Sequence, residues 1–199
     1  MGAVAERNLY PLFLHLEGRD VLVVGAGSVA EKKIEDLVAA KADIRVVAPK
    51  ATKRIRELAK AGTIAWSARA FTVSDVAGAW LVVSATGSRS VAKRVFQEAE
   101  ERLVFVLAVD DPKNGSAISS SVVRRDPFVV AISSSGHAPA LTRLLRELIE
   151  QILPEDRWIR AARDLRSHWR VEHVPMGSRF AELVRSFKAR ATKKATGAK

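Results

Sequence analysis

The sequence predicts an α/β fold built around a parallel sheet, and three observations support this prediction. Four consecutive apolar residues, 21–24, run directly into the glycine-rich turn 25–27, and a helical pattern opens at Ser28. Further apolar runs at 44–48, 80–86 and 104–109 alternate with segments of helical periodicity. The chain, at 199 residues and 48% hydrophobic, is long enough for one such domain and an appendage. Strands that alternate with helices at this spacing form βαβ units with right-handed crossovers.

The turn after the first strand fits the pattern G-x-G-x-x-G/A, with Gly25, Gly27 and Ala30 in the three small positions. In dinucleotide-binding folds of the Rossmann type the first glycine permits a sharp turn and the second lets the backbone approach a pyrophosphate. The third small residue lets helix and strand pack closely, and the helix amino end offers unpaired N–H groups to the phosphates. The alternative is an ordinary strand–helix turn whose glycines serve geometry alone. The preceding apolar strand and the following helical pattern favour a nucleotide site.

The second strand, expected at 44–48, lacks the acidic residue that holds the ribose in a standard NAD site. Pro49 and Lys50 follow this strand, whereas Asp43 precedes it and so lies at the wrong end. Either Lys50 accommodates the 2′-phosphate of NADP or it is a solvated loop lysine. Recognition of the ribose must then come from the backbone or from other side chains, and NADP stays open as the cofactor.

The remaining pattern predicts a second, different region after residue 116. An antiparallel pair and two or three helices are expected there, and the helix at 156–171 is two-faced, with apolar side chains opposite a row of arginines. The further predicted elements are an edge segment at 10–16, helices at 28–40, 52–61 and 90–102, a strand at 63–69, strands at 117–123 and 128–132, helices at 140–153 and 179–190, and a basic disordered tail at 191–199.

The formal net charge of +11 is unevenly spread. Residues 151–199 contain 12 Lys/Arg and 5 Asp/Glu, which favours a polyanionic partner: nucleic acid, an acidic surface or a multiply carboxylated small molecule. No nucleic-acid-binding motif appears, so nucleic acid is the weakest of these. There is no cysteine, and no apolar run approaches the roughly 20 residues of a membrane span. We expect a soluble, cytoplasmic protein without a membrane segment.

Several strings of the sequence occur, in order, in one known family. The chain resembles the precorrin-2 dehydrogenase/sirohydrochlorin ferrochelatase family, the N-terminal module of siroheme synthase, from about residue 9 to residue 154. The strings that carry the resemblance are 10–14 with Gly18-Arg19, the glycine turn with 30–33, 46–49, 109–112, 121–125, and 131–134 with Gly136 and 138–140.

The resemblance implies an organisation and a reaction. It implies an NAD-binding domain at 1–118, a dimerisation segment at 119–150 and a helical domain at 151–190. The protein would be a homodimer that oxidises the tetrapyrrole precorrin-2 to sirohydrochlorin by hydride transfer to NAD. In some members ferrous iron is then inserted as a second substrate, giving siroheme, and whether this chain retains that chelatase activity is left open.

The resemblance also assigns site residues. It makes Asp110, at the end of the strand 104–109, the catalytic residue, and a carboxylate there suits the removal of a proton as hydride leaves the macrocycle. The alternative is that Asp110 caps the turn before Pro112, with Asp111 as a neighbour of the same type. The assigned cofactor contacts are Gly25, Gly27, Ser28, Val29, Pro49 and Lys50. The glycine motif itself adds Ala30 to the cofactor site, and Thr86 is added because it ends a strand that faces the cofactor.

Substrate contacts are expected from two places. Ser134 matches a family serine near the substrate, and His137 lies in the same loop, although both are also compatible with plain loop residues. Arg163, Arg166 and Arg170 lie on the polar face of the helix 156–171, where they would bind the substrate carboxylates or form a solvated face. No protein ligand set for a metal is predicted.

The chain departs from the family pattern at a few positions near the expected nicotinamide end. Gly87 and Ser88 replace two aspartates, Leu107 replaces an asparagine, and Ala92 and Ser120 also differ. These differences keep a second interpretation open, a non-catalytic relative that binds a nucleotide or tetrapyrrole.

Overall fold

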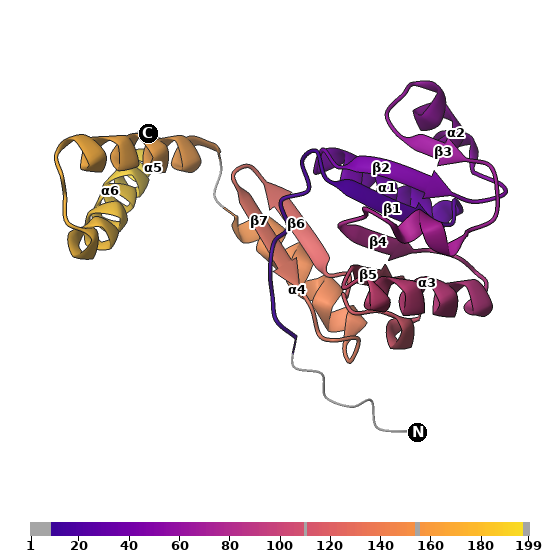
Figure 1. Ribbon diagram of the computed structural model, residues 1–199. Helices are drawn as coiled ribbons and strands as arrows, with labels where there is room; N and C mark the ends of the chain where they lie inside the picture. Colours follow the sequence, from indigo (N-terminus) through magenta and orange to yellow (C-terminus); the bar gives the residue numbers. More distant parts are fainter. Residues whose placement is uncertain (1–8, 110, 154–155, 197–199) are drawn as a thin grey trace. The chain divides into compact units, whose positions relative to one another are not determined.

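The computed structural model describes residues 9–109, 111–153 and 156–196 and divides the chain into two compact units between Ser120 and Ser121 (Figure 1). Each unit is described by itself. The first contains β1 (Asp20–Val24), α1 (Ser28–Ala39), β2 (Asp43–Val47), α2 (Lys53–Lys60), β3 (Ala65–Ser67), η1 (Val73–Val76), β4 (Leu81–Ser84), α3 (Arg89–Glu101), β5 (Phe105–Ala108) and η2 (Pro112–Asn114).

The first unit is a parallel sheet with helices on both faces. Its strand order is β3-β2-β1-β4-β5, and every neighbouring pair is parallel. Because successive side chains alternate between faces, the buried valines and leucines of β1 belong to two different clusters. Val21 and Val23 pack with Ile34 of α1 and Ile55 of α2, whereas Leu22 and Val24 belong to the cluster that contains α3. The predicted doubly wound α/β class is confirmed.

The strand order places the switch point of the sheet between β1 and β4. From β1 the chain moves outward to β2 and β3, then returns to β4 on the other side of β1 and continues to β5. In such sheets ligands bind outside the carboxyl ends of the strands at this point. The turns after β1, β4 and β5 are therefore where a site is expected.

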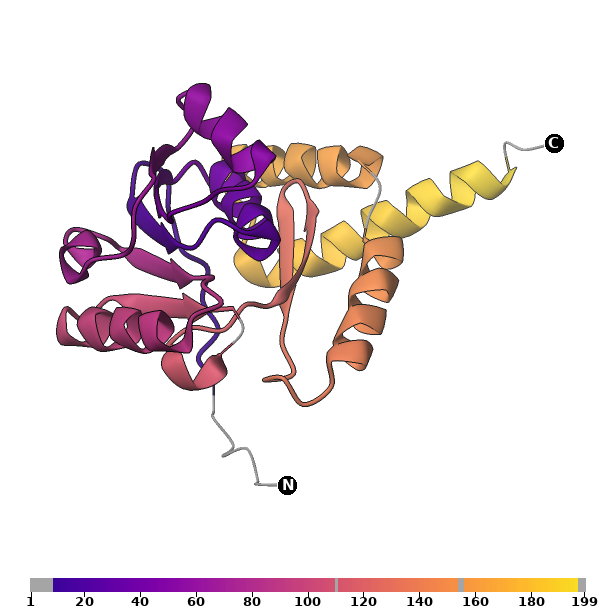
Figure 2. The same cartoon turned by 90° about the vertical axis from the view of Figure 1, so that its right-hand side faces the viewer.

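The second unit consists of an antiparallel hairpin and three helices. These are β6 (Ser121–Arg125), β7 (Phe128–Ile132), α4 (Pro139–Ile152), α5 (Asp156–Val171) and α6 (Met176–Thr196). Helix α4 lies alongside the hairpin (Figure 2). Helices α5 and α6 contact each other, and the Trp169 Nε1–H donates to Glu182 Oε2 at 2.9 Å.

Four predicted elements are absent from the structure or differ from it by two residues or more at both ends. The strand expected at 117–123 begins four residues later and is β6, Ser121–Arg125. The prediction of an edge segment at 10–16 was wrong. No strand forms there, because Pro11 lacks an N–H and residues 9–15 are exposed and do not pack on the sheet. The third strand is shorter than 63–69, since only Ala65–Ser67 pair with β2. Helix α6 starts before 179 and continues past 190 to Thr196, because no glycine or proline interrupts 178–196. The last three residues of the predicted disordered tail lie outside the described residues.

Among the helices of the described ranges, none combines the length and apolarity that crossing a bilayer requires.

Candidate nucleotide-binding site

The turn after β1 lies in close contact with the turn after β4. Gly25 has a φ of +108°, and a Cβ at this position would overlap the Ala85 carbonyl, with 2.6 Å to Ala85 C and 3.1 Å to Thr86 N. The Gly25 N–H donates to Val47 O at 3.0 Å, so the turn is also fixed to β2. Only glycine fits both the conformation and the space here.

Gly27 has the opposite surroundings. It is the N-cap of α1 with a φ of −84°, and a Cβ placed on it would meet no heavy atom within 4 Å. No side chain caps this helix, and its first hydrogen bond runs from Glu31 N–H to Gly27 O at 3.0 Å. The preceding amides, those of Ser28, Val29 and Ala30, have no partner within the helix, which is the arrangement that binds phosphate groups.

The third small residue of the motif serves packing, as predicted from the sequence. Ala30 is fully buried under β1 in the cluster of Ile34 and Ile55. Ser28 and Val29 are exposed at the helix end. The open position at Gly27 and the uncapped amides thus fit the pyrophosphate of a dinucleotide, whereas Ala30 only lets the helix approach the sheet.

The loop after β2 is tied to the glycine turn. The Thr52 N–H donates to Ala26 O at 3.0 Å, and Thr52 Oγ1 donates to Glu31 Oε2 at 2.6 Å while accepting from the Ile55 N–H. Pro49 and Lys50 lie in this loop and are exposed. Sequence reasoning missed the Glu31–Thr52 bond, because two residues 21 positions apart carry no local signal of their contact.

The ends of β4 and β5 complete this edge of the sheet. The Ala85 N–H donates to Val24 O at 2.9 Å, and the Val109 N–H donates to Ser84 O at 3.0 Å. Thr86 is half-buried next to the Gly25 turn, and its Oγ1 accepts from the Ser88 N–H at 3.2 Å. Asp110, which follows Val109, lies outside the described residues.

Asp111 has a structural role, which the sequence alone could not distinguish from a catalytic one. It is the N-cap of η2, and its carboxylate accepts from the Lys113 N–H at 3.3 Å and from Asn114 Nδ2 at 2.7 Å. The cap of the turn before Pro112 is therefore Asp111.

The predicted substrate residues belong to the second unit. Ser134 and His137 lie in the loop before α4, where the His137 N–H donates to Ser134 O at 2.9 Å. The Ser134 hydroxyl accepts from the Ala138 N–H at 3.1 Å and lies 2.9 Å from Thr142 Oγ1. The His137 side chain is exposed and Ser134 is half-buried. Through these hydrogen bonds Ser134 holds the amino end of α4 in place.

Arg163, Arg166 and Arg170 lie on one exposed face of α5, opposite the buried Ala161 and Trp169. The predicted two-faced helix is present. Arg163 Nη2 pairs with Asp126 Oδ2 at 3.0 Å in the β6–β7 turn. Both side chains of that pair are exposed, so the pair contributes little to stability.

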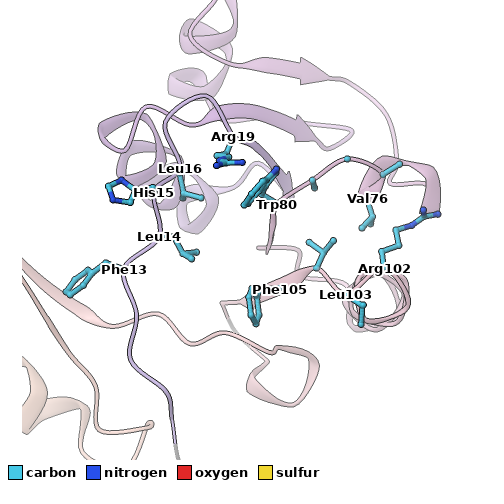
Figure 3. A pocket seen from close by; sticks show the side chains of 14 residues that line it. Phe13, Leu14, His15, Leu16, Arg19, Val76, Trp80, Arg102, Leu103 and Phe105 are labelled. Carbon is cyan, nitrogen blue, oxygen red and sulfur yellow. The ribbon is translucent and has the colours of Figure 1, made fainter.

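A cavity of about 710 Å³ lies at the other edge of the sheet, at the amino ends of β1, β4 and β5 (Figure 3). Its lining includes Phe13, Trp80 and Phe105, and the Arg19 guanidinium stacks 3.5 Å from the centre of the Trp80 ring. None of the predicted site residues lines it. No local pattern in the sequence indicates this cavity, because its apolar residues come from three separate loops.

The charges near that amino edge are paired with one another. Arg45 Nη2 lies 2.6 Å from Asp20 Oδ2, and Arg69 Nη1 donates to Asp75 Oδ2 at 2.8 Å. Asp75 is buried, and the Arg69 guanidinium lowers the pKa of its carboxyl from 3.8 to about 2, helped by hydrogen bonds from Thr72. These pairs fasten η1 and its flanking loops to the sheet.

The residues that depart from the family pattern have ordinary structural places. Ser88 caps α3 through a hydrogen bond from the Val91 N–H at 3.4 Å, and Ala92 is buried against the sheet. Leu107 lies in β5, half-buried against the core. In the described part of the chain, no three His, Cys, Asp or Glu side chains come close enough to share a metal ion.

The sheet order, the strained Gly25 turn and the uncapped α1 define a Rossmann-type dinucleotide-binding domain. The family model described as "Putative NAD(P)-binding" matches residues 12–121, and the model "Sirohaem biosynthesis protein central" matches residues 125–152. Siroheme synthase 3 of Aeromonas hydrophila is 43% identical over 171 residues, which cover 85% of this chain and 36% of that protein. Siroheme synthase of Neisseria meningitidis is 37% identical over 195 residues, covering 90% of this chain and 40% of that protein.

The solved structure of SirC, a precorrin-2 dehydrogenase, has the same fold, with a TM-score of 0.75 at 24% identity over 89% of this chain and 88% of that one. The chain belongs to the family of NAD(P)-binding siroheme biosynthesis proteins that comprises the siroheme synthase N-terminal module. It spans about two fifths or less of the length of the curated relatives described above.

Proposed function

We propose that this chain is an NAD-dependent precorrin-2 dehydrogenase, which oxidises precorrin-2 to sirohydrochlorin. One observation carries the proposal: the glycine turn that suits a pyrophosphate and the strand that leads into Asp110 end at the same edge of the sheet. The turn after β4 contacts Gly25, and the Val109 N–H is bonded to Ser84 O at the end of β4. The family membership identifies the tetrapyrrole as the substrate class to test.

The reaction needs an acceptor for a hydride and an acceptor for a proton. Bound NAD supplies the hydride acceptor, its nicotinamide ring. The amides of Ser28 and Val29 would hold its pyrophosphate, and the open space at Gly27 would admit it. The Asp110 carboxylate takes the proton that the macrocycle loses, so precorrin-2 and NAD give sirohydrochlorin, NADH and one proton.

Asp110 is favoured over Asp111 as the base because the Asp111 carboxylate already accepts two hydrogen bonds within η2. The Asp111 side chain is thus already used as the cap of η2.

The substrate is an anion, and the second unit offers cations for it. We propose that Arg166 and Arg170 bind carboxylates of the macrocycle, because they are exposed on the same face of α5. Arg163 joins them by exchanging its exposed partner Asp126 for a substrate carboxylate. Ser134 and His137 are proposed to contact the same ligand from the loop before α4.

We propose further that the active form is a homodimer built on 119–150. None of the 14 residues of α4 is buried in the single chain. Its leucines repeat along one side and are exposed by 53% at Leu141, 50% at Leu144, 40% at Leu145 and 47% at Leu148. A second copy of the same helix is the simplest cover for such a face. We propose a cytoplasmic location, where the NAD that the reaction consumes is available.

The test is an assay of purified protein with precorrin-2 and NAD, run with and without ferrous iron. The proposal predicts NADH and sirohydrochlorin in equal amounts without iron, and siroheme with iron if the chelatase is retained. The second candidate, a non-catalytic relative, is motivated by Leu107, Gly87 and Ser88. Tight tetrapyrrole binding without any NADH would favour it and contradict the dehydrogenase.

A further inference from the structure

We propose that the cavity at the amino edge of the sheet is a second ligand-binding site, which takes a small molecule with a flat aromatic body and one carboxylate. The cavity, of about 710 Å³, is lined only by residues of the first unit (Figure 3). Small-molecule sites commonly have volumes of roughly 300–1,000 Å³, and this cavity lies within that range. The inference goes beyond the proposed function, because the nucleotide site lies at the carboxyl edge of the same sheet.

The walls of the cavity carry large apolar side chains that the fold leaves uncovered. The exposed fractions are 68% for Phe13, 57% for Trp80, 93% for Leu103 and 51% for Phe105, and all four residues line the cavity. Contiguous apolar surface of this kind is uncommon on a soluble domain unless it binds another molecule. Three aromatic rings around one cavity favour a ligand that is itself flat and apolar.

The ionisable residues of the lining are all basic. His15, Arg19 and Arg102 line the cavity, and its described lining contains no Asp or Glu. Arg102 is paired with Glu98 at 2.6 Å. The Arg19 guanidinium stacks 3.5 Å from the centre of the Trp80 ring, and the described residues offer it no carboxylate and no hydrogen-bond acceptor. Its N–H donors are therefore available to a ligand.

The carboxylates next to Arg19 in the sequence are bound by other cations. Glu17 pairs with Lys41 at 2.9 Å. Both carboxylate oxygens of Asp20 accept from the Arg45 guanidinium, at 2.6–3.0 Å. Arg19 could take either carboxylate only by breaking an existing pair, so its acceptor must come from outside the fold. A guanidinium binds a carboxylate through two parallel hydrogen bonds, which makes a carboxylate the matching anion.

Backbone hydrogen bonds hold Arg19 and Trp80 in place without a ligand. The Arg19 N–H donates to Leu16 O at 2.9 Å, and the Arg19 carbonyl accepts from the Asp43 N–H at 2.9 Å. The Trp80 N–H donates to Asp20 O at 2.8 Å. An arginine and an aromatic ring that are already fixed side by side lower the cost of ordering the site when a ligand binds.

The cavity and the nucleotide site are separate, although the same strands border both. Arg19 and Trp80 directly precede β1 and β4, whereas Gly25 and Ala85 directly follow these strands. A strand rises by about 3.3 Å per residue, so a strand of five residues spans roughly 16 Å. A ligand in the cavity and a nucleotide at the glycine turn can therefore be bound at the same time.

The experiment titrates the full chain with 2-naphthoate and follows the indole N–H resonances of its four tryptophans by NMR. We expect the Trp80 resonance, assigned with Trp80→Phe, to shift with a dissociation constant of about a millimolar or below. Saturating NAD should not reverse the shift. The uncharged analogue 2-naphthamide should bind roughly tenfold more weakly, and Arg19→Gln should weaken 2-naphthoate by about the same factor. Arg19→Gln should change the affinity for 2-naphthamide by less than about twofold.

The matched control is Arg94→Gln, which removes the same charge from an exposed arginine of α3 that does not line the cavity. It should leave the affinity for 2-naphthoate unchanged. A second variant, Leu103→Asp, places a carboxylate at the cavity and should weaken 2-naphthoate by repulsion. The fold should tolerate it, because Leu103 is exposed and has a φ of +57°, which aspartate adopts more readily than leucine.

The inference is overturned if millimolar 2-naphthoate leaves the Trp80 resonance unmoved, if NAD displaces the ligand, or if Arg19→Gln and Arg94→Gln have equal effects. A Trp80 resonance that moves when the protein alone is diluted would also overturn it, since another copy of the chain would then cover the cavity. Binding of 2-naphthoate in a protein that binds no nucleotide would contradict only the proposed function.

Discussion

Gly25 and Ala85 lie so close that a single Cβ on the glycine would occupy the space of the Ala85 carbonyl. This contact joins the end of β1 to the turn after β4, at the switch point of the sheet. Gly27, two residues later, has open space where a Cβ would lie. The two glycines of one motif are therefore required for different reasons.

Gly25→Ala should destabilise the fold, because alanine is strained at a φ of +108° and must displace the β4 turn. The strain alone costs about 1–3 kcal/mol in the free energy of unfolding. Gly27→Ala should leave that free energy nearly unchanged and weaken nucleotide binding by roughly tenfold, since its Cβ fills the space of the pyrophosphate. Urea unfolding and calorimetric titration of both variants separate the two effects. Equal loss of stability in both would contradict this division.

The acid stability of the first unit should depend on Asp75. Its folded-state pKa, about 2, lies below the ordinary value of 3.8, so ionised Asp75 stabilises the native state above about pH 4. That contribution, on the order of 2 kcal/mol, is lost as the pH falls from about 4 to about 2. Asp75→Asn should remove it at neutral pH and flatten the stability profile over this range. The control is Glu57→Gln, which breaks an exposed pair with Lys53 in the same unit and should change nothing measurable. An unchanged profile in Asp75→Asn would contradict the role of the Arg69 pair.

Leu144→Glu should convert the proposed dimer to a monomer, because it places a charge in the middle of the apolar side of α4. Leu144 is 50% exposed in the single chain. Analytical ultracentrifugation gives the mass directly. Leu103→Glu, the same change at a leucine that is 93% exposed in the first unit, should leave the dimer intact. A monomeric unmodified protein, or a dimeric Leu144→Glu variant, would show that this face does not hold two copies together.

Removing both Arg166 and Arg170 should raise the KM for precorrin-2 by roughly tenfold or more and leave the affinity for the nucleotide unchanged. The reason is that the two arginines are proposed to bind carboxylates of the macrocycle and not the cofactor. Arg185→Ala, an exposed arginine of α6, serves as control. If the double variant has an unaltered KM, the arginine face is only a solvated surface.

The core of the nucleotide site could be predicted from the sequence because its signals are local. A strand, two glycines and a buried alanine lie within ten residues, and each has one physical reason to be there. The absence of a carboxylate after β2 could also be predicted from the sequence, since the direction of the strand alone puts Asp43 at the start of β2.

Contacts between distant segments could not be predicted in this way. Nothing local in the sequence indicates that Glu31 bonds Thr52, or that Asp111 and not Asp110 caps the following turn. The prediction for 10–16 was wrong because its apolar residues suggested pairing with the edge of a sheet, whereas residues 10–15 remain exposed in the structure. The prediction of disorder was wrong for 191–196: a segment with nothing to bury still continues α6 to Thr196, because lysine and alanine are good helix formers.

The most direct measurement of the central claim is a single-turnover assay of NADH formation from precorrin-2 with Asp110→Ala and Asp111→Ala side by side. We expect Asp110→Ala to lose about a hundredfold or more in rate while binding NAD as the unmodified protein does. Asp111→Ala should retain the chemistry and lose only about 1 kcal/mol of stability with its cap. Full activity in Asp110→Ala would contradict the account.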